Sequence, residues 1–272
     1  MSQYANRTFA PRISCSVNRK GVLDIDTVKG CRCGMDKYPN GGCYGLCYAA
    51  KLAKVYGFDF SVSVSRLPST DDPRQGILFP GLFCGGPKRI YDTVKYHKGP
   101  FFRIGTMGDP CHDWQLTTYI CGWLCHLKVP VVITKHWITI PDDLLTRLEE
   151  YGAIVNTSIS PLDTKDEIEH RLSQFNRLGA VGIRSVLRIV SCKFGETETG
   201  NRLDIAQARL FRNAPLIDNP LRIPLNDPRV VRGDIVARSV KDLHGKVGIS
   251  IANKKTYIGE CGACPDQCGI FN

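Results

Sequence analysis

The sequence predicts an α/β protein built as a partial (β/α)6 barrel of the TIM type, with a cysteine-rich C-terminal extension. Two observations lead to this fold class. Apolar, β-branched runs alternate with stretches of helical spacing from residue 101 to residue 223, and such alternation implies βα units and a parallel sheet. With one earlier strand included, the count is about six units, too few for the eight of a closed barrel.

The elements follow one another along the chain. Apolar and β-branched composition predicts strands at 101–109, 129–136, 153–160, 183–192 and 215–223. Helical spacing, acidic starts and glycine ends predict helices at 114–128, 141–152, 166–182 and 203–214. An earlier strand is expected around 12–17 or 22–28, and the Pro- and Gly-rich residues 67–99 are expected to form a surface excursion.

We expect two parts. Residues 1–228 form the barrel, with a cysteine loop at 29–57 and barrel units at 101–223, and residues 229–272 form the extension. Active sites of such folds lie at the carboxyl ends of the strands. Residues able to do chemistry follow the predicted strands at these ends: Asp109, Cys111, His112, Lys135, His136, Asn156, Ser158, Ser160, Arg188 and Cys192.

Composition limits the classes of function. The 272 residues contain no apolar run of about 18 residues, and the first residues lack the apolar core of a secretory signal. We therefore expect a soluble cytoplasmic protein with no membrane partner, in which thirteen cysteines serve metal or redox chemistry rather than disulfides. A net charge of +10 suits a nucleic-acid partner; the alternative is a merely basic enzyme.

Four cysteines, Cys31, Cys33, Cys43 and Cys47, fall within the segment "CRCGMDKYPNGGCYGLC". A helix is predicted to begin at Cys47, where backbone N–H groups would lower thiol pKa values. Grouped thiolates bind zinc, copper(I) or iron–sulfur clusters. Cys31 and Cys33 point to opposite sides of an extended chain, so one of them is expected to join Cys43 and Cys47. Three thiolates on a four-iron cluster leave one iron open.

A second group of cysteines ends the chain. Cys261, Cys264 and Cys268 have C-x₂-C-x₃-C spacing within "CGACPDQC". Gly and Pro allow the backbone to wrap around an ion there. An auxiliary iron–sulfur cluster is expected at these residues; zinc, or no metal, is the alternative.

The cysteine loop followed by "CYA" and a helix resembles the radical S-adenosylmethionine superfamily, nearest to its spore photoproduct lyase-like branch. "RIGTMGDP" is similar to the second-strand segment of that family, and "NTSISPLDTKDEIEHRLSQFNRLGAVGIRSVLRI" to a later strand–helix–strand run. The likeness covers roughly residues 29–61 and 101–192. The usual C-x₃-C-x₂-C spacing is absent, because no cysteine follows Cys47 closely. The third ligand must lie upstream, and we prefer Cys31 to Cys33.

The resemblance implies a [4Fe–4S] cluster on Cys31, Cys43 and Cys47. It also implies S-adenosylmethionine, which an electron from a donor such as flavodoxin or ferredoxin cleaves to a 5′-deoxyadenosyl radical. Cofactor contacts are expected from Tyr48, Gly108, Asp109, Asn156, Ser158 and Arg188. Cys111 is the candidate catalytic hydrogen donor. For Asp109 the alternative is a helix N-cap, and for Arg188 it is a surface salt bridge.

Charge and resemblance together favour a radical enzyme that modifies, rearranges or repairs a nucleic-acid base, with a modified thymine in DNA as one candidate substrate. Two alternatives remain open. One is a radical enzyme acting on a small molecule or peptide. The other is a non-catalytic, metal-stabilised nucleic-acid-binding protein, which would need aromatic side chains beside basic ones. Only "KVYGFDF" and "IYDTVKYHK" have that composition.

Overall fold

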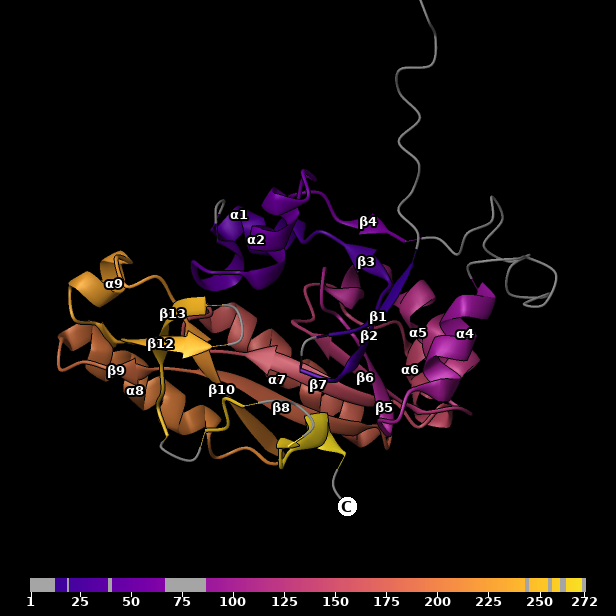
Figure 1. Ribbon diagram of the computed structural model, residues 1–272. Coiled ribbons are helices and arrows are strands. Elements are labelled where there is room, and N and C mark those ends of the chain that lie inside the picture. The colour runs from indigo at the N-terminus through magenta and orange to yellow at the C-terminus, as the bar shows by residue number, and fades with distance from the viewer. Residues whose placement is uncertain are drawn as a thin grey trace, which may run out of the picture.

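The computed structural model describes residues 13–18, 20–38, 41–66, 87–242, 245–253, 256–259 and 263–270. Within these ranges the protein is α/β, with a large, mostly parallel central sheet (Figure 1). Six neighbouring strands of the described chain run parallel and follow chain order. They are β2 (Leu23–Asp26), β5 (Phe101–Ile104), β6 (Val129–Thr134), β7 (Ile154–Ile159), β8 (Arg184–Ser191) and β10 (Leu216–Arg222). The expected α/β class is confirmed.

Antiparallel strands extend the sheet at both ends. β1 (Ser14–Val17) pairs with β2, while β13 (Gly245–Ser250) pairs with β10 and β12 (Arg238–Asp242) with β13. Two short ribbons lie apart from it: β3 (Val28–Lys29) with β4 (Val64–Ser65), and β9 (Lys193–Phe194) with β11 (Ile235–Val236). The C-terminal extension thus continues the sheet, and the expected boundary after residue 228 falls within α9 (Pro228–Val231).

Five of the described helices cover one face of the sheet: α4 (Pro87–Tyr96), α5 (Trp114–Leu124), α6 (Asp142–Glu150), α7 (Lys165–Ala180) and α8 (Glu198–Leu210). Their apolar side chains form two buried clusters with alternate strand residues, such as Phe102 and Ile104. The expected surface excursion is wrong over α4, because Ile90 and Val94 bury one side of this helix in the core. Residues 67–86 lie outside the described residues.

Local sequence explains where these helices begin. Thr164 and Glu167 form a capping box at the start of α7, which satisfies two backbone N–H groups that lack helical partners. α8 begins at Glu198, earlier than expected, because the Thr197 hydroxyl accepts a hydrogen bond from the Gly200 N–H and caps the helix.

The opposite sheet face is only partly covered. Near the amino ends of the strands, Val22, Phe101, Val131, Ile154, Val186 and Ile217 form a buried cluster with Cys268. At the carboxyl ends, the cysteine loop folds into α1 (Arg32–Lys37), a 3₁₀ turn η1 (Gly42–Tyr44) and α2 (Tyr48–Val55). Figure 1 shows α1 and α2 far from the yellow C-terminal segment. Among the described helices, none is long and apolar enough to cross a membrane.

Candidate functional site

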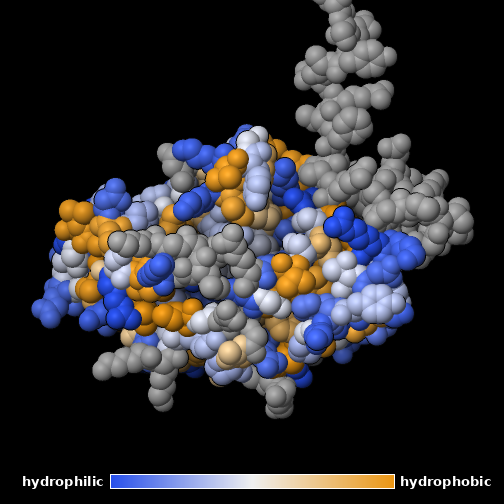
Figure 2. Space-filling view, viewed as in Figure 1, coloured by the Kyte–Doolittle hydropathy of each residue, from blue (hydrophilic) through white to orange (hydrophobic). Residues whose placement is uncertain are grey.

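A cavity of about 1670 Å³ opens on the partly covered sheet face. Strand residues, α2 and the C-terminal segment line it, including Arg103, Arg188, Tyr48 and Cys264. Pockets for small ligands usually hold about 300–1000 Å³, so the cavity has room for more than one small molecule. Hydrophilic and hydrophobic side chains are intermixed on the face drawn in Figure 2.

The cavity carries an excess of positive charge. Of the described residues that line it, seven are Lys or Arg and four are Asp. Arg103 Nε donates to Asp24 Oδ1 at 2.8 Å, and Asp26 Oδ1 accepts from the N–H groups of Thr106 and Met107 at 2.9 and 2.8 Å. Burial raises the pKa of Asp26. With the Arg103–Asp24 pair set aside, six basic and three acidic side chains remain in the described part of the lining, so its net charge toward a ligand is positive.

Three thiols of the cysteine loop lie close together. A Cβ added to Gly34 would lie 3.1 Å from Cys31 Sγ and 3.2 Å from Cys43 Sγ, and one added to Gly42 would lie 3.3 Å from Cys47 Sγ. Burial raises the pKa of Cys31, and negative charge on Asp109, Cys43 and Cys47 raises it further. The absence of a side chain at Gly34 therefore leaves a space bordered by sulfur atoms.

Cys33 is not part of this group. It belongs to α1 and is half-buried, and the charges that affect its pKa belong to Arg32, Asp36 and Asp109 rather than to other cysteines. The expected net fall in the thiol pKa values is wrong, because burial outweighs the lowering effect of the helix N–H groups. Burial raises the pKa of Cys47, although N–H groups of Ala50 and Ala49 oppose the rise, and it raises the pKa of Cys43 to about 11.

Within the described ranges, no three His, Cys, Asp or Glu side chains converge closely enough to hold one metal ion. A zinc ion needs four donors within about 2.3 Å of one point, whereas each thiolate on an iron–sulfur cluster binds its own iron. Two thiols at the space beside Gly34 and a third beside Gly42 are a spacing that suits a cluster of several irons better than a single zinc. The buried thiols would lose protons when metal binds.

Two glycines hold the start of the loop in place. Gly30 has a φ of +85°, and a Cβ there would lie 2.0 Å from the Val62 carbonyl oxygen. Gly108 forms a parallel bridge with Gly30, and its own Cβ would meet the carbonyl oxygens of Gly30 and Val28 at 2.7 Å. Gly108, an expected cofactor contact, therefore allows the backbone after β5 to touch the strand that leads to Cys31.

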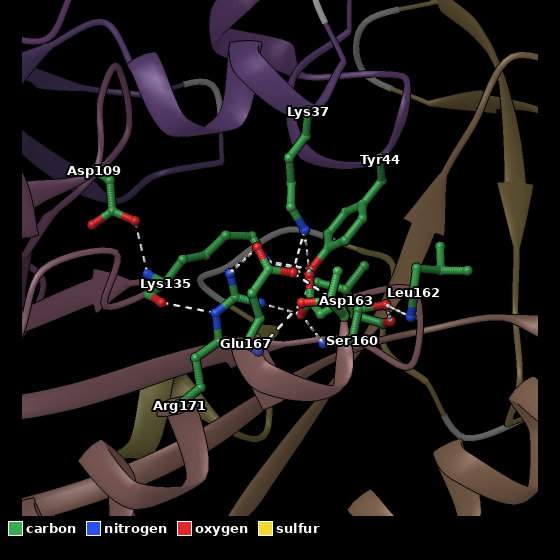
Figure 3. Close-up of polar contacts among 11 residues, drawn as sticks. Lys37, Tyr44, Asp109, Lys135, Ser160, Leu162, Asp163, Glu167 and Arg171 are labelled. Carbon is green, nitrogen blue, oxygen red and sulfur yellow. Dashed lines mark hydrogen bonds and ion pairs between the residues drawn. The ribbon is translucent and has the colours of Figure 1, made fainter. Parts of the chain in front are cut away.

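A buried polar network anchors the loop to the sheet (Figure 3). Tyr44 Oη donates to Asp163 at 3.0 Å and accepts from the ammonium of Lys135. Arg171 forms an ion pair with Asp163 and donates to the Lys135 carbonyl oxygen at 2.8 Å. Lys37 of α1 pairs with Glu167 of α7. The side chains of Arg171 and Asp163 are 1% and 0% exposed. Lys135, which follows β6, and Asp163, which follows β7, therefore hold the cysteine loop through buried hydrogen bonds and ion pairs.

Sequence reasoning missed this network. Glu167 and Arg171 are spaced i, i+4 on a helix, a pattern that usually marks an exposed pair. The available signal was the position of Arg171 one residue before Leu172, on the apolar side of the helix that also carries Phe175.

Asp109 caps the 3₁₀ turn η2 (Pro110–Asp113) by accepting from the Cys111 N–H at 3.1 Å, which confirms the N-cap alternative. It also accepts from Thr134 Oγ1 at 2.6 Å and from the Lys135 N–H at 2.7 Å. This side chain is buried and ties three segments together beside the thiols.

Polar strand residues meet at the cavity, where Arg188 and Asn219 belong to the lining while Asn156 and Ser158 are buried behind it. Arg188 donates through Nη2 and Nε to Asn156 Oδ1 at 3.0 and 3.2 Å, and through Nη1 to Asn219 Oδ1 at 3.2 Å. Its described partners are thus amide oxygens rather than the carboxylate of a surface salt bridge. Asn156 is fully buried and donates to the Cys268 carbonyl, and Ser158 is buried two residues further along β7.

The other candidate residues are more dispersed. Tyr48 begins α2 at the cavity border and is 48% exposed. Cys111 is buried at 1% exposure in the core between sheet and helices, where burial raises its pKa, and it does not line the cavity. Of the C-terminal set, Cys264 and Cys268 line the cavity, while Cys261 lies outside the described residues.

No protein-family model, curated protein or solved structure matches this chain. No relative therefore indicates what the protein binds or which reaction it catalyses.

Proposed function

We propose that the protein is a radical S-adenosylmethionine enzyme that modifies, rearranges or repairs a nucleic-acid base. The observation that carries this proposal is the grouping of three thiols. The Cys31 and Cys43 sulfurs border the space at Gly34, Cys47 Sγ lies beside Gly42 and its charge acts on both of the other thiols, and Cys33 is outside the group. In this proposal the three thiolates hold a [4Fe–4S] cluster. When bound, the cluster and S-adenosylmethionine would supply a carbon radical able to remove hydrogen from the substrate.

We infer that the sheet is a partial barrel. The six parallel strands follow chain order, and α4 to α8 contribute to the apolar clusters on one sheet face. When all helices pack on one face of a parallel sheet, the other face is left for ligands. The loops at the carboxyl ends of the strands then supply the reactive groups. The cysteine loop follows β2, the first of the parallel strands, which agrees with this arrangement.

The chain's own residues would orient the cofactor. The Arg188 guanidinium can pair with the methionyl carboxylate, because its planar donors match that group. The ring of Tyr48, which lines the cavity, can lie beside the adenine. Asn156, Ser158 and Asp109 are buried behind the cavity lining, where Asn156 holds the Arg188 guanidinium and Asp109 holds the end of β6, so they would position the cofactor contacts. Cys111 is not included in this proposed set, because it packs in the core away from the cavity.

The basic cavity and the net charge of +10 support a nucleic-acid substrate over a small molecule. Anionic phosphates would be attracted to this surface, and the volume of the cavity admits a nucleotide in addition to a cofactor.

Iron binding tests the proposal. Anaerobic reconstitution with iron and sulfide should load about four irons per chain, or about eight if the C-terminal cysteines bind a second cluster. Reduction in the presence of S-adenosylmethionine should then release 5′-deoxyadenosine. Cys31→Ala, Cys43→Ala and Cys47→Ala should each abolish this release, because each removes one thiolate. Cys33→Ala is the matched control and should leave it intact.

Two results would contradict the proposal. One is stoichiometric zinc without nucleoside release, which would favour the non-catalytic binding protein. The other is undiminished nucleoside release when Cys43 and Cys47 are both changed to alanine.

A further inference from the structure

The helix α2 has two chemically different sides. Ala49, Ala50 and Ala53 are buried and pack in one cluster with Cys31 and Phe60. The other side carries residues at the spacing i, i+3, i+4, i+7 and i+8, which places them on one stripe. We call this stripe, which ends in the turn after the helix, the α2 stripe; its members are Tyr48, Lys51, Leu52, Val55 and Tyr56.

All five residues of the α2 stripe line the cavity. Val55 and Tyr56 are 70% and 71% exposed, and Tyr48 is 48% exposed. An aromatic and aliphatic strip left in solvent beside a large cavity indicates a surface that binds a partner. Figure 1 shows α2 at the outer edge of the molecule.

Charge identifies the chemistry of that partner. No Asp or Glu occurs from Lys37 to Phe58, and Lys51 and Lys54 are both exposed on α2. The adjoining cavity carries more basic than acidic side chains. A partner that satisfies both properties has flat apolar faces for the tyrosines and negative charge for the lysines, which is the chemistry of a nucleic-acid strand.

We propose that a single nucleic-acid strand lies along the α2 stripe, with a base stacked on Tyr56 and a phosphate held by Lys51. Tyr48 and Tyr56 are about 12 Å apart along the helix axis, so they serve different nucleotides. Because α2 begins directly after Cys47, a strand in this position leads its next base into the cavity near the thiols. This inference rests on the proposed function and specifies where its substrate binds.

Fluorescence anisotropy tests the stacking contact. The probe is a fluorescein-labelled thymidine oligonucleotide of about 20 nucleotides, titrated with the reconstituted full chain. Tyr56→Ala should raise Kd by about 5- to 150-fold, the range expected for loss of one stacked base. Tyr56→Phe keeps the ring and should stay within about twofold of the native Kd. Tyr56→Leu keeps apolar bulk without the ring and should bind as weakly as Tyr56→Ala.

Matched controls separate loss of binding at the α2 stripe from the effect of removing any exposed side chain or charge. Ile205→Ala removes an apolar side chain that is 58% exposed on α8, and should leave Kd unchanged. Lys51→Ala should reduce the slope of log Kd against log salt by about one, whereas Lys165→Ala on α7 should not. Thermal melting checks that Tyr56→Ala still folds, as its exposure predicts.

Two outcomes overturn the inference: no binding of the oligonucleotide at 50 mM salt, or native affinity for it in Tyr56→Leu, which would show that no base stacks on the ring. Neither depends on cofactor chemistry. If 5′-deoxyadenosine is released but the oligonucleotide does not bind, this inference is overturned while the proposed radical chemistry stands. Tyr56-dependent binding without iron uptake supports the surface and overturns the proposed reaction.

Discussion

At the scale of single residues, the choice between Cys31 and Cys33 shows what spacing can and cannot determine. The sequence limited the expected third thiol to these two positions, and a short helix brings only Cys31 to the space that Cys43 also borders. α1 begins at Arg32, so Cys31 occupies the position before the helix and is buried, while Cys33 lies on the helix itself. A six-residue helix has too few periodic positions to be recognised from sequence.

Gly34→Ala tests the space between the thiols. Alanine normally stabilises a helix interior by about 0.5–1 kcal/mol relative to glycine. Here the new methyl would lie 3.1 and 3.2 Å from the sulfurs of Cys31 and Cys43, so iron uptake should fall severalfold even if the apoprotein is as stable as the native chain. Iron content after reconstitution and a denaturant titration measure the two effects separately.

Gly179→Ala is the control, because a Cβ there meets only Ser185 Oγ, at 3.9 Å. It should raise stability without any change in iron content. Full iron loading of Gly34→Ala would mean that the space at Gly34 is not where the cluster lies.

At the scale of elements, the sequence predicted the regular βα units well and the loops poorly. The strands β5 to β8 and β10 and the helices α5 to α7 lie within the expected ranges or start one residue before them, because apolar periodicity and caps act locally. The polar face of β7, with Asn156 and Ser158, was also expected from alternation. The network around Arg171 was not, because whether a charged residue is buried depends on contacts between distant elements.

Arg171→Met tests how firmly α7 holds the cysteine loop. The substitution leaves the buried Asp163 carboxylate without its closest ion-pair partner, and loss of one partner of a buried pair costs about 3–5 kcal/mol. The free energy of unfolding from urea titrations should fall by that amount.

Lys165→Met on the same helix breaks the exposed i, i+4 pair with Glu169 and should cost about 0.5 kcal/mol or less. Equal effects of the two substitutions would show that the buried network adds nothing to the stability of the fold.

At the scale of the whole molecule, stability should depend on pH through His136. This side chain is fully buried, and burial lowers its pKa to about 3, with a lesser contribution from the neighbouring charges of His170, Arg171 and Arg177 and an opposing one from Asp109. The unfolded chain takes up the proton near pH 6.5. The stabilisation is therefore complete above that pH and is lost as the pH falls toward 3.

Between pH 7 and pH 5 this linkage should remove about 2 kcal/mol from the free energy of unfolding. His136→Asn suits the positive φ of 50° at this position and cannot titrate. Urea titrations at both pH values should show a smaller difference for this variant than for the native protein. An identical pH dependence in the two proteins would exclude His136 as its source.

The buried cluster at the amino ends of the strands joins Val22, near the beginning of the chain, to Cys268, near its end. During synthesis the ribosome must therefore release Cys268, more than 240 residues after Val22, before this cluster can be completed. Until then the apolar side chains of this cluster remain exposed to water. We expect this side of the cavity to be completed only after the segment that carries Cys268 has packed against the sheet.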